Sequence, residues 1–159
     1  LTRFAIESED DYDPSHSRSV ARVAIILNGI RVNLFSTHLD AGSSSRRISQ
    51  IRELTSRADN DAEQRIILGD FNARSSSDEI SQMKAGYADA WAVGQSLDLD
   101  VAYEGNPSGN TRNGRIDYAF YSKRAAHLKL RKAQVFDTRD RKGAMPSDHR
   151  PLLVTFDVK

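Results

Sequence analysis

Residues 20–38 read VARVAIILNGIRVNLFSTH, two apolar and β-branched runs on either side of Asn28-Gly29. β-branched residues favour strands, because their side chains pack well on a pleated surface. An Asn-Gly pair tolerates the positive φ angles that a two-residue type I′ turn requires. The stretch therefore predicts a β hairpin, whose second strand ends in the polar sequence Ser36-Thr37-His38.

Two helices are expected after the hairpin. Apolar residues recur at helical spacing over residues 44–59, which predicts an amphipathic helix with one buried face. Its apolar positions are Ile48, Ile51, Leu54 and Ala58. Further along, Ser76 with Glu79 three positions later suits a capping pair at the start of a short helix.

The remaining apolar runs predict strands over residues 64–68, 116–121, 128–136 and 151–158, and a strand or a helical turn over 88–93. Polar stretches rich in Pro, Gly, Asn or charge predict loops over residues 7–19, 98–114 and 139–147. Strands and helices do not alternate strictly, so a parallel βαβ fold does not fit. We expect an α/β sandwich of largely antiparallel sheets with outer helices, in a single domain over residues 1–159.

Composition excludes several classes of protein. The chain has 159 residues and no cysteine, which rules out disulfides, thiolate metal sites and cysteine nucleophiles. No run approaches the roughly 18 apolar residues of a membrane span. Net charge is +1, but residues 111–159 carry 12 basic and 5 acidic side chains. This basic third could attract phosphate-bearing ligands, or could be a solvated face that balances an acidic one.

Polar side chains follow or precede four of the predicted strands. Strand ends that meet loops hold side chains rigidly and still leave them accessible. The residues are His38, then Asp70 and Asn72, then Asp117, and finally Asp148 and His149. Taken singly, each has an ordinary structural explanation, such as a packed histidine, a turn or an ion pair. Asp40, close to His38, is expected to be a turn residue.

Taken together, the four motifs resemble a known family. S-T-H-L at 36–39, L-G-D-F-N at 68–72, R-I-D-Y at 115–118 and S-D-H-R-P at 147–151 follow one another as in the endonuclease/exonuclease/phosphatase superfamily. The resemblance starts at residues 1–4, which look like the family's strand before the hairpin. It implies a deoxyribonuclease-I-like fold, a four-layered α/β/β/α sandwich of two mixed, largely antiparallel sheets. It also implies hydrolysis of phosphate esters with Mg²⁺, or with Mn²⁺ in its place.

The resemblance also implies catalytic roles. Asp70 would activate the attacking water and bind the metal ion, and Asn72 would donate a hydrogen bond to the substrate phosphate. His149 would contact the phosphate and shuttle a proton, while Asp117 would hold its imidazole in one tautomer. His38 would lie on the opposite wall of the site and touch the scissile phosphate.

Several further residues are candidates for supporting roles. Asp148 would be a metal ligand or a carboxylate just outside the metal's ligands. Arg115 and Tyr118 would contact substrate, although Tyr118 also suits the core. Arg112, Arg139, Arg141 and Lys142 join Arg115 either as the lining of a phosphate-tracking groove or as solvated loop cations.

One part of the family pattern has no counterpart here. The family begins with a strand that ends in a metal-site Asn and a strand that ends in Gln-Glu, whose Glu is the principal Mg²⁺ ligand. Glu7 and Glu9 lie in a polar stretch and do not match. We therefore expect a fold that is incomplete at its N-terminus, with an exposed apolar face, and weak or no activity of the chain alone. A homodimer or strand exchange would cover the bare sheet edge.

Two functions are compatible with these motifs. The first is a metal-dependent phosphoesterase, either a phosphodiesterase or nuclease, or a phosphatase. The alternative is a non-catalytic module that keeps the fold and binds an anion or nucleic acid. No motif distinguishes DNA, RNA, phospholipid and inositol phosphate as substrates. A secreted or periplasmic location is slightly favoured over a cytoplasmic one, since many bacterial relatives are secreted.

Overall fold

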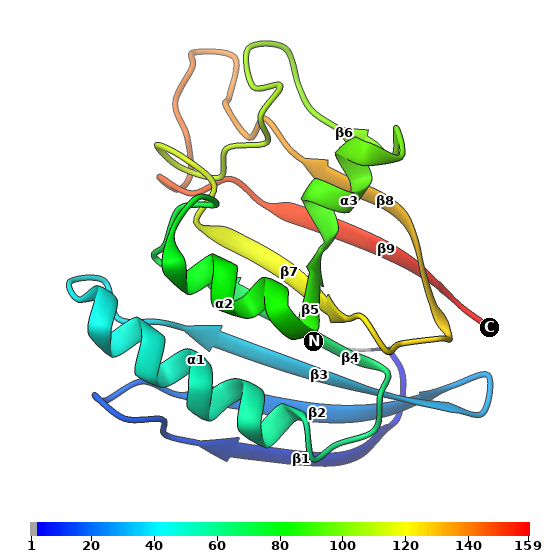
Figure 1. Cartoon of the computed structure of the whole chain (residues 1–159). Helices are drawn as coiled ribbons and strands as arrows, with labels where there is room; N and C mark the ends of the chain where they lie inside the picture. Colours follow the sequence, from blue (N-terminus) through cyan, green and yellow to red (C-terminus); the bar gives the residue numbers. More distant parts are fainter. Residues whose placement is uncertain (1–2) are drawn as a thin grey trace.

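The computed structural model describes residues 3–159 and arranges nine strands in two sheets, with three helices (Figure 1). The six-stranded sheet has the order β1-β2-β3-β4-β7-β5, with β1 Ile6–Tyr12, β2 Val20–Leu27, β3 Ile30–His38, β4 Arg65–Asp70, β7 Asp117–Ser122 and β5 Tyr87–Asp89. The three-stranded sheet has the order β6-β8-β9, with β6 Asp100–Val101, β8 Leu128–Val135 and β9 Leu152–Val158. The helices are α1 Ser44–Ala58, α2 Asp78–Gly86 and α3 Ala90–Ser96.

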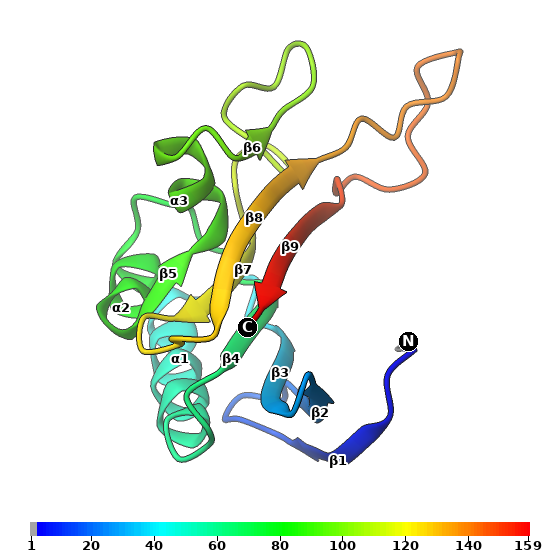
Figure 2. The same ribbon diagram turned by 90° about the vertical axis from the view of Figure 1, so that its right-hand side faces the viewer.

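The two sheets are mixed and largely antiparallel, as the sequence predicts. Among the described strands only the pairs β3–β4 and β6–β8 are parallel. Helix α1 makes the crossover that parallel neighbours require, between β3 and β4. All three helices lie on one side of the molecule (Figure 2). The described residues thus form three layers of the predicted sandwich, namely the helices, the six-stranded sheet and the three-stranded sheet.

The predicted hairpin is confirmed. Strands β2 and β3 pair in antiparallel register from Val20↔Thr37 to Leu27↔Ile30. The turn residues Asn28 and Gly29 have φ angles of 52° and 77°, the two positive values that a type I′ turn requires. The turn therefore fixes the register that brings His38 to the end of β3.

The predicted loop over residues 7–19 is wrong in its first half, which forms strand β1. Of its seven residues, only Tyr12 is buried, so the sequence shows no apolar alternation. Strand β1 lies at the sheet edge and is held by backbone pairing to β2, which sequence patterns do not reveal. Leu1 and Thr2 of the predicted first strand lie outside the described residues, and Arg3 and Phe4 are not part of a strand.

Other boundaries differ by a residue or more. The cap of α2 is Ser77 rather than Ser76, and its side chain accepts a hydrogen bond from the amide of Ile80. Residues 88–93, predicted as a strand or a helical turn, contain the end of β5 and the start of α3. Asp89 ends that strand and also caps the helix, because its carboxylate accepts from the amides of Trp91 and Ala92. The short strand β6 interrupts the predicted loop over 98–114.

Two hydrophobic layers flank the six-stranded sheet. One layer lies between the sheet and helices α1 and α2, and includes Phe35, Ile51, Leu54, Ile67 and Phe120. The other lies between the two sheets, where residues of β2, β3, β4 and β7 meet residues of β8 and β9. The alternation of side chains along each strand supplies both layers, since neighbouring residues point to opposite faces.

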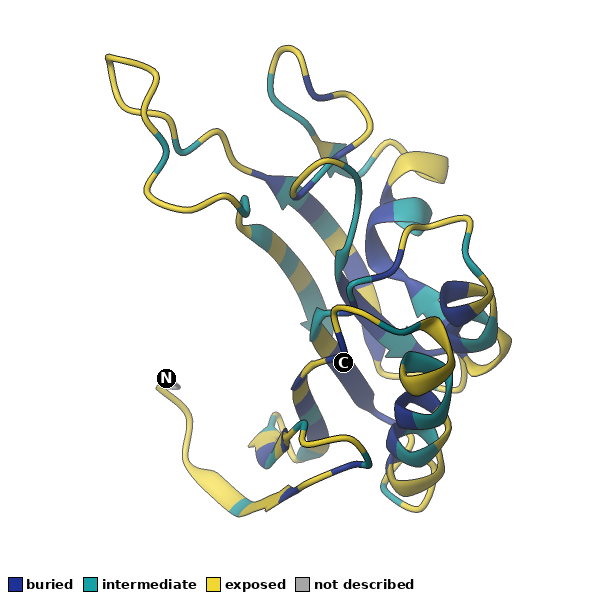
Figure 3. Cartoon of the chain, turned by 90° about the vertical axis from the view of Figure 1, so that its left-hand side faces the viewer, coloured by how far each residue is buried: buried dark blue, intermediate teal, exposed yellow. Residues whose placement is uncertain are grey.

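The space between the sheets is open near β9. A groove of about 610 Å³ runs between the sheets there and is lined mainly by apolar residues. Strand β9 lies at a sheet edge and none of its residues is buried (Figure 3). Leu68 and Leu153 beside this groove are among the exposed large apolar side chains. No helix in residues 3–159 is long and apolar enough to cross a membrane.

Gly69 allows β3 and β4 to lie side by side near the end of the sheet. Its φ angle is +144°, and an added Cβ atom would lie 1.8 Å from the carbonyl oxygen of Thr37. Thr37 is its register partner in β3. Any side chain at this position would therefore push β3 and β4 apart just before the residues that end them.

We expect Gly69→Ala to lower the free energy of unfolding by about 3 kcal/mol or more, because backbone strain and a steric clash add. Gly29→Ala is the matched control, since Gly29 also has a positive φ angle but nothing within 4 Å of the added Cβ. The control should cost only about 1–2 kcal/mol. Denaturant unfolding of both variants measures this, and equal losses would contradict the close approach at Gly69.

Candidate active site

Three strand ends bring polar side chains together at one rim of the six-stranded sheet. In the register, His38 of β3 pairs with Asp70 of β4, and Asp70 pairs with Asp117 of β7. Because side chains alternate along a strand, these residues share a face with apolar residues that line the groove, such as Leu68 and Ala119. The three polar residues therefore end the sheet face that is turned toward the second sheet.

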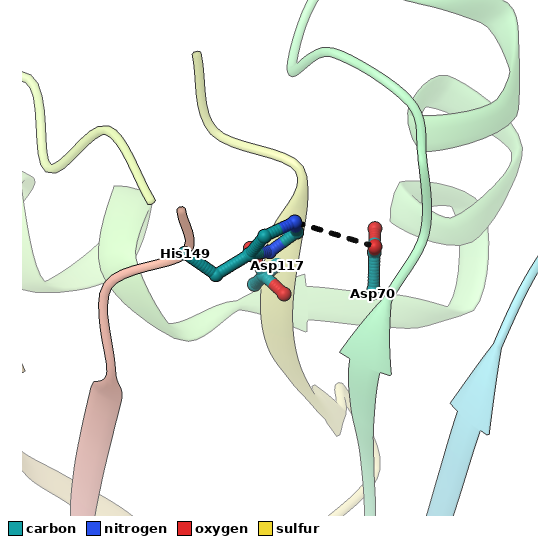
Figure 4. A group of neighbouring side chains, drawn as sticks. All are labelled: Asp70, Asp117 and His149. Atoms are coloured by element: carbon teal, nitrogen blue, oxygen red, sulfur yellow. Dashed lines mark hydrogen bonds and ion pairs between the residues drawn. The ribbon is translucent and has the colours of Figure 1, made fainter. Parts of the chain in front are cut away.

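His149 reaches this rim from the second sheet, on the segment just before β9. Its Nδ1 atom lies 2.9 Å from Oδ2 of Asp117, and its Nε2 atom lies 4.0 Å from Oδ2 of Asp70. Figure 4 shows the imidazole between the two carboxylates. On the other side of Asp70, Nε2 of His38 lies 3.5 Å from the same Oδ2 atom. The structure thus brings together four of the predicted residues, and Asp70 lies between the two imidazoles.

The contact with Asp117 orients the imidazole of His149. An ionised carboxylate only accepts hydrogen bonds, so Nδ1 is the donor and carries the hydrogen. In a neutral imidazole this leaves Nε2 as an acceptor on the side of Asp70. The side chains of Asp70, Asp117 and His149 are 17%, 24% and 27% exposed, against 59% for His38. The first three therefore form a partly enclosed set, and His38 faces solvent.

Asn72 is positioned by a turn rather than by a continuing strand. Two positions after Asp70, Asn72 would share its side of the sheet if the strand continued, but β4 ends at Asp70 and Asn72 has a φ angle of 48°. Its amide donates to Oδ1 of Asp70 at 2.7 Å, and its Nδ2 donates to the carbonyl of Leu39 at 3.1 Å. The left-handed conformation suits Asn. The turn keeps Asn72 beside Asp70 and also ties it to the chain that follows β3.

Asp148 takes a different direction from its neighbour His149. Its carboxylate is 66% exposed and lies 2.6 Å from the guanidinium of Arg112. Asp40, near His38, is the turn residue that the sequence predicts, since its carboxylate accepts from the amides of Gly42 and Ser43. These hydrogen bonds, that of Gly42 foremost, hold the pKa of Asp40 below its usual value.

Asp70, Asp117 and His149 could hold a metal ion. Each offers one ligand atom, and these atoms all lie within 4.8 Å of one another. It is the one group of this kind in residues 3–159. Two carboxylates suit a hard cation such as Mg²⁺, which is bound through one or two carboxylates while waters and substrate complete its coordination.

The sequence profile of the Endonuclease/Exonuclease/phosphatase family matches residues 1–149. The chain belongs to this family. The family description covers endonucleases, exonucleases and phosphatases, which all act on phosphate esters. A comparison with curated protein sequences found no match.

Several solved structures share the fold of this chain. The catalytic domain of human Nocturnin, solved with a bound sulfate anion, has a TM-score of 0.78 and 20% identity, with 99% of this chain and 60% of that chain covered. A mannosyl-6-phosphatase from Bacteroides thetaiotaomicron has a TM-score of 0.73 and 19% identity, over 96% and 67%. Sphingomyelinase C from Streptomyces griseocarneus has a TM-score of 0.69 and 19% identity, over 97% and 65%. The chain therefore spans about two thirds or less of each.

Arg115 and Tyr118, which were predicted to contact substrate, make contacts within the protein. Arg115 forms an ion pair with Asp89, and the two side chains are only 10% and 2% exposed. Tyr118 is 2% exposed, and its hydroxyl lies within hydrogen-bond distance of the carbonyls of Ala73 and Arg115. Burial raises the pKa of Tyr118 well above its usual value, so the phenol remains a donor. The guanidinium of Arg115 and the hydroxyl of Tyr118 thus both have partners within the protein, and substrate contact by either side chain stays a prediction.

Most of the loop cations are paired with acids. Arg112, Arg115 and Arg139 have carboxylate partners in Asp148, Asp89 and Asp137. Hydrogen bonds from Arg139 lower the pKa of Asp137 to about 2. Among the described residues, Arg141 and Lys142 have no such ion pair. Acidic partners thus neutralise most of the cations that were predicted to line a phosphate-tracking groove.

Sequence reasoning missed the role of the loop between β6 and β7. Thr111 is 1% exposed, and its hydroxyl oxygen accepts from the amides of Ile116 and Asp117. Asn106, which is 5% exposed, closes the same loop through hydrogen bonds to Asn110. These residues lie in a stretch rich in Gly, Asn and Pro, where no periodic pattern marks a buried side chain. Asn106 and Asn110, four residues apart, were the available signal of an ordered turn.

Arg115→Gln should lower the free energy of unfolding by about 3–5 kcal/mol, because the buried carboxylate of Asp89 loses its partner. Arg112→Gln breaks the exposed pair with Asp148 and should cost less than about 1 kcal/mol. Denaturant unfolding of both variants distinguishes them. If Arg115→Gln were as stable as Arg112→Gln, the structural assignment of Arg115 would be wrong.

Proposed function

We propose that this chain carries the catalytic centre of a metal-dependent hydrolase of phosphate esters. The observation that supports this most is the convergence of Asp70, Asp117 and His149 from two sheets, with ligand atoms within 4.8 Å. Each residue lies in one of the sequence motifs that resemble the family, and the family profile matches residues 1–149. Residues that are only structural have no need to bring two carboxylates and an imidazole to one accessible rim.

Asp70 acts on the attacking water. Its Oδ1 atom accepts the amide of Asn72, which fixes the carboxylate, and its Oδ2 atom faces both imidazoles. The water oxygen forms a bond to phosphorus while the bond between phosphorus and the ester oxygen breaks. Asp70 takes the proton that the water loses, as a general base.

His149 moves that proton and contacts the phosphate. Asp117 keeps Nδ1 in its donor role, so Nε2 accepts the proton from Asp70 and passes it to the departing oxygen. His38 contacts the phosphate from the opposite side of Asp70. Asn72 has a second amide hydrogen besides the one given to Leu39, and donates it to a phosphate oxygen. The substrate phosphate thus meets donors on both sides of the carboxylate.

The donor set fits a divalent cation. Asp70 would hold the ion, and a carboxylate oxygen of Asp117 lies within 4.8 Å of the ligand atom of Asp70. Mg²⁺ or Mn²⁺ would suit these ligands. When bound, such an ion stabilises the charge that develops on the phosphate oxygens. Asp148 could join the ion only by leaving Arg112.

The charges near the rim bear on the class of phosphate ester. The pairing of Arg112, Arg115 and Arg139 with acids argues against a long cationic groove for nucleic acid. Binding of an anion without hydrolysis is the alternative function. It predicts phosphate affinity that survives a chelator and no turnover of any ester.

Asp70→Asn and His149→Ala should each lower hydrolysis of a nitrophenyl phosphodiester by about 10²–10⁴-fold, since each removes a proton-transfer group. A chelator should abolish the activity of the unaltered protein. Asp98→Asn and His127→Ala are matched controls, because these residues lie outside the rim, and both should keep normal turnover. Hydrolysis that resists chelation, or that both active-site variants retain, would refute the proposal.

The chain alone should bind Mg²⁺ more weakly than micromolar and turn over esters slowly, because within residues 3–159 the group that could hold a metal contains only two carboxylates, Asp70 and Asp117. Calorimetric titration with Mg²⁺ measures the affinity, and sedimentation analysis of the same sample gives the oligomeric state. The homodimer or strand exchange predicted from the sequence would appear there. Micromolar affinity in a confirmed monomer would contradict this prediction.

A further inference from the structure

The Asp117–His149 pair joins two sheets that touch only loosely at this end. Asp117 begins β7 in one sheet, whereas His149 belongs to the irregular segment that precedes β9 in the other. The amide of His149 donates to the exposed neighbour Ser147, a local contact that cannot fix its position relative to β7. The open groove below the pair provides no packing on that side. Some other group must therefore hold His149 beside Asp117.

Thr111 makes hydrogen bonds to the backbone of Asp117 and to the backbone of Arg150, the residue after His149. Its hydroxyl oxygen accepts from the amide of Asp117 at 3.1 Å and from the amide of Ile116 at 3.3 Å. Its carbonyl oxygen accepts from the amide of Arg150, the residue after His149, at 2.7 Å. A single residue thus connects the start of β7 to the segment that carries the imidazole.

Thr111 is also linked, through one further hydrogen bond, to the chain beside Asp70. The carbonyl of Ile116 accepts from the amide of Phe71, which follows Asp70. Arg112, next to Thr111, adds the ion pair with Asp148 and accepts from the guanidinium of Arg150 through its carbonyl. The loop therefore links the residues on both sides of His149, Asp148 and Arg150, to the strand that carries Asp117.

We propose that Thr111 is a positioning residue that sets the Asp117–His149 pair, and with it the tautomer of His149. The effect of Thr111 on catalysis rests on the proposed function, whereas its effect on the position and tautomer of His149 does not. Thr111 is 1% exposed, so water cannot replace its hydroxyl oxygen as the acceptor of two amides. A displacement of about 1 Å in a catalytic group can cost on the order of 10²-fold in rate.

The test compares Thr111→Val with Thr111→Ser. Valine has nearly the shape of threonine but no acceptor, whereas serine keeps the hydroxyl oxygen. Thr55→Val, at a half-buried position of α1, is the control for the same substitution away from the site. It removes the hydrogen bonds of the Thr55 hydroxyl to the carbonyls of Ile51 and Arg52. The readout independent of turnover is the ¹⁵N NMR signature of the His149 imidazole at about pH 9, where histidines are normally neutral.

We expect the unaltered protein, Thr111→Ser and Thr55→Val to show hydrogen on Nδ1 of His149. Thr111→Val should shift the population toward hydrogen on Nε2, because the carboxylate of Asp117 no longer faces Nδ1. On a nitrophenyl phosphodiester, Thr111→Val should lower kcat by about 10²-fold with little change in KM. An unchanged Nδ1 signature in folded Thr111→Val would overturn the proposal.

Two further measurements keep the outcomes separate. If Thr111→Val does not fold, amide hydrogen exchange of the unaltered protein decides, since the amides of Ile116, Asp117 and Arg150 should open together. Free exchange at Arg150 beside a protected Asp117 would overturn the proposal. If the unaltered protein hydrolyses no ester, the proposed function fails, while the NMR signature still tests Thr111.

Discussion

The close approach of two backbones at Gly69 is the constraint on which the site depends. Because Gly69 has no side chain, β4 can lie against the carbonyl of Thr37 and keep its parallel register with β3. That register sets His38 beside Asp70, and the antiparallel pairing with β7 sets Asp117 on the other side. The glycine of the G-D-F-N motif therefore sets the spacing of the strands, and this spacing places the aspartate after it between His38 and Asp117 at the rim.

The second sheet adds an imidazole, that of His149, which faces the carboxylates of the first sheet. Strands β3, β4 and β7 supply carboxylates and an exposed imidazole on one surface, whereas His149 faces them from across the groove. The imidazole of His149 therefore lies opposite the carboxylate of Asp70 rather than beside it on the same sheet.

The sequence predicted the elements whose signals are local. The Asn28-Gly29 turn, the apolar face of α1 and the order of the polar motifs could all be read from neighbouring residues. Strand β1 could not, because its side chains are exposed and only backbone pairing with β2 defines it. The roles of Arg115 and Thr111 were hidden for a related reason. Their partners Asp89 and Arg150 lie 26 and 39 residues away, and only the folded chain brings them together.

The order of the site residues along the chain has a consequence for maturation. Both carboxylates lie on strands that are synthesised before β8 and β9, whereas His149 comes just before the final strand. A nascent chain can therefore build the helical face and the acidic rim without gaining the imidazole. The imidazole would join the carboxylates only when the β8–β9 pair docks, and a partial opening of that pair would separate His149 from Asp117 while most of the six-stranded sheet stays intact.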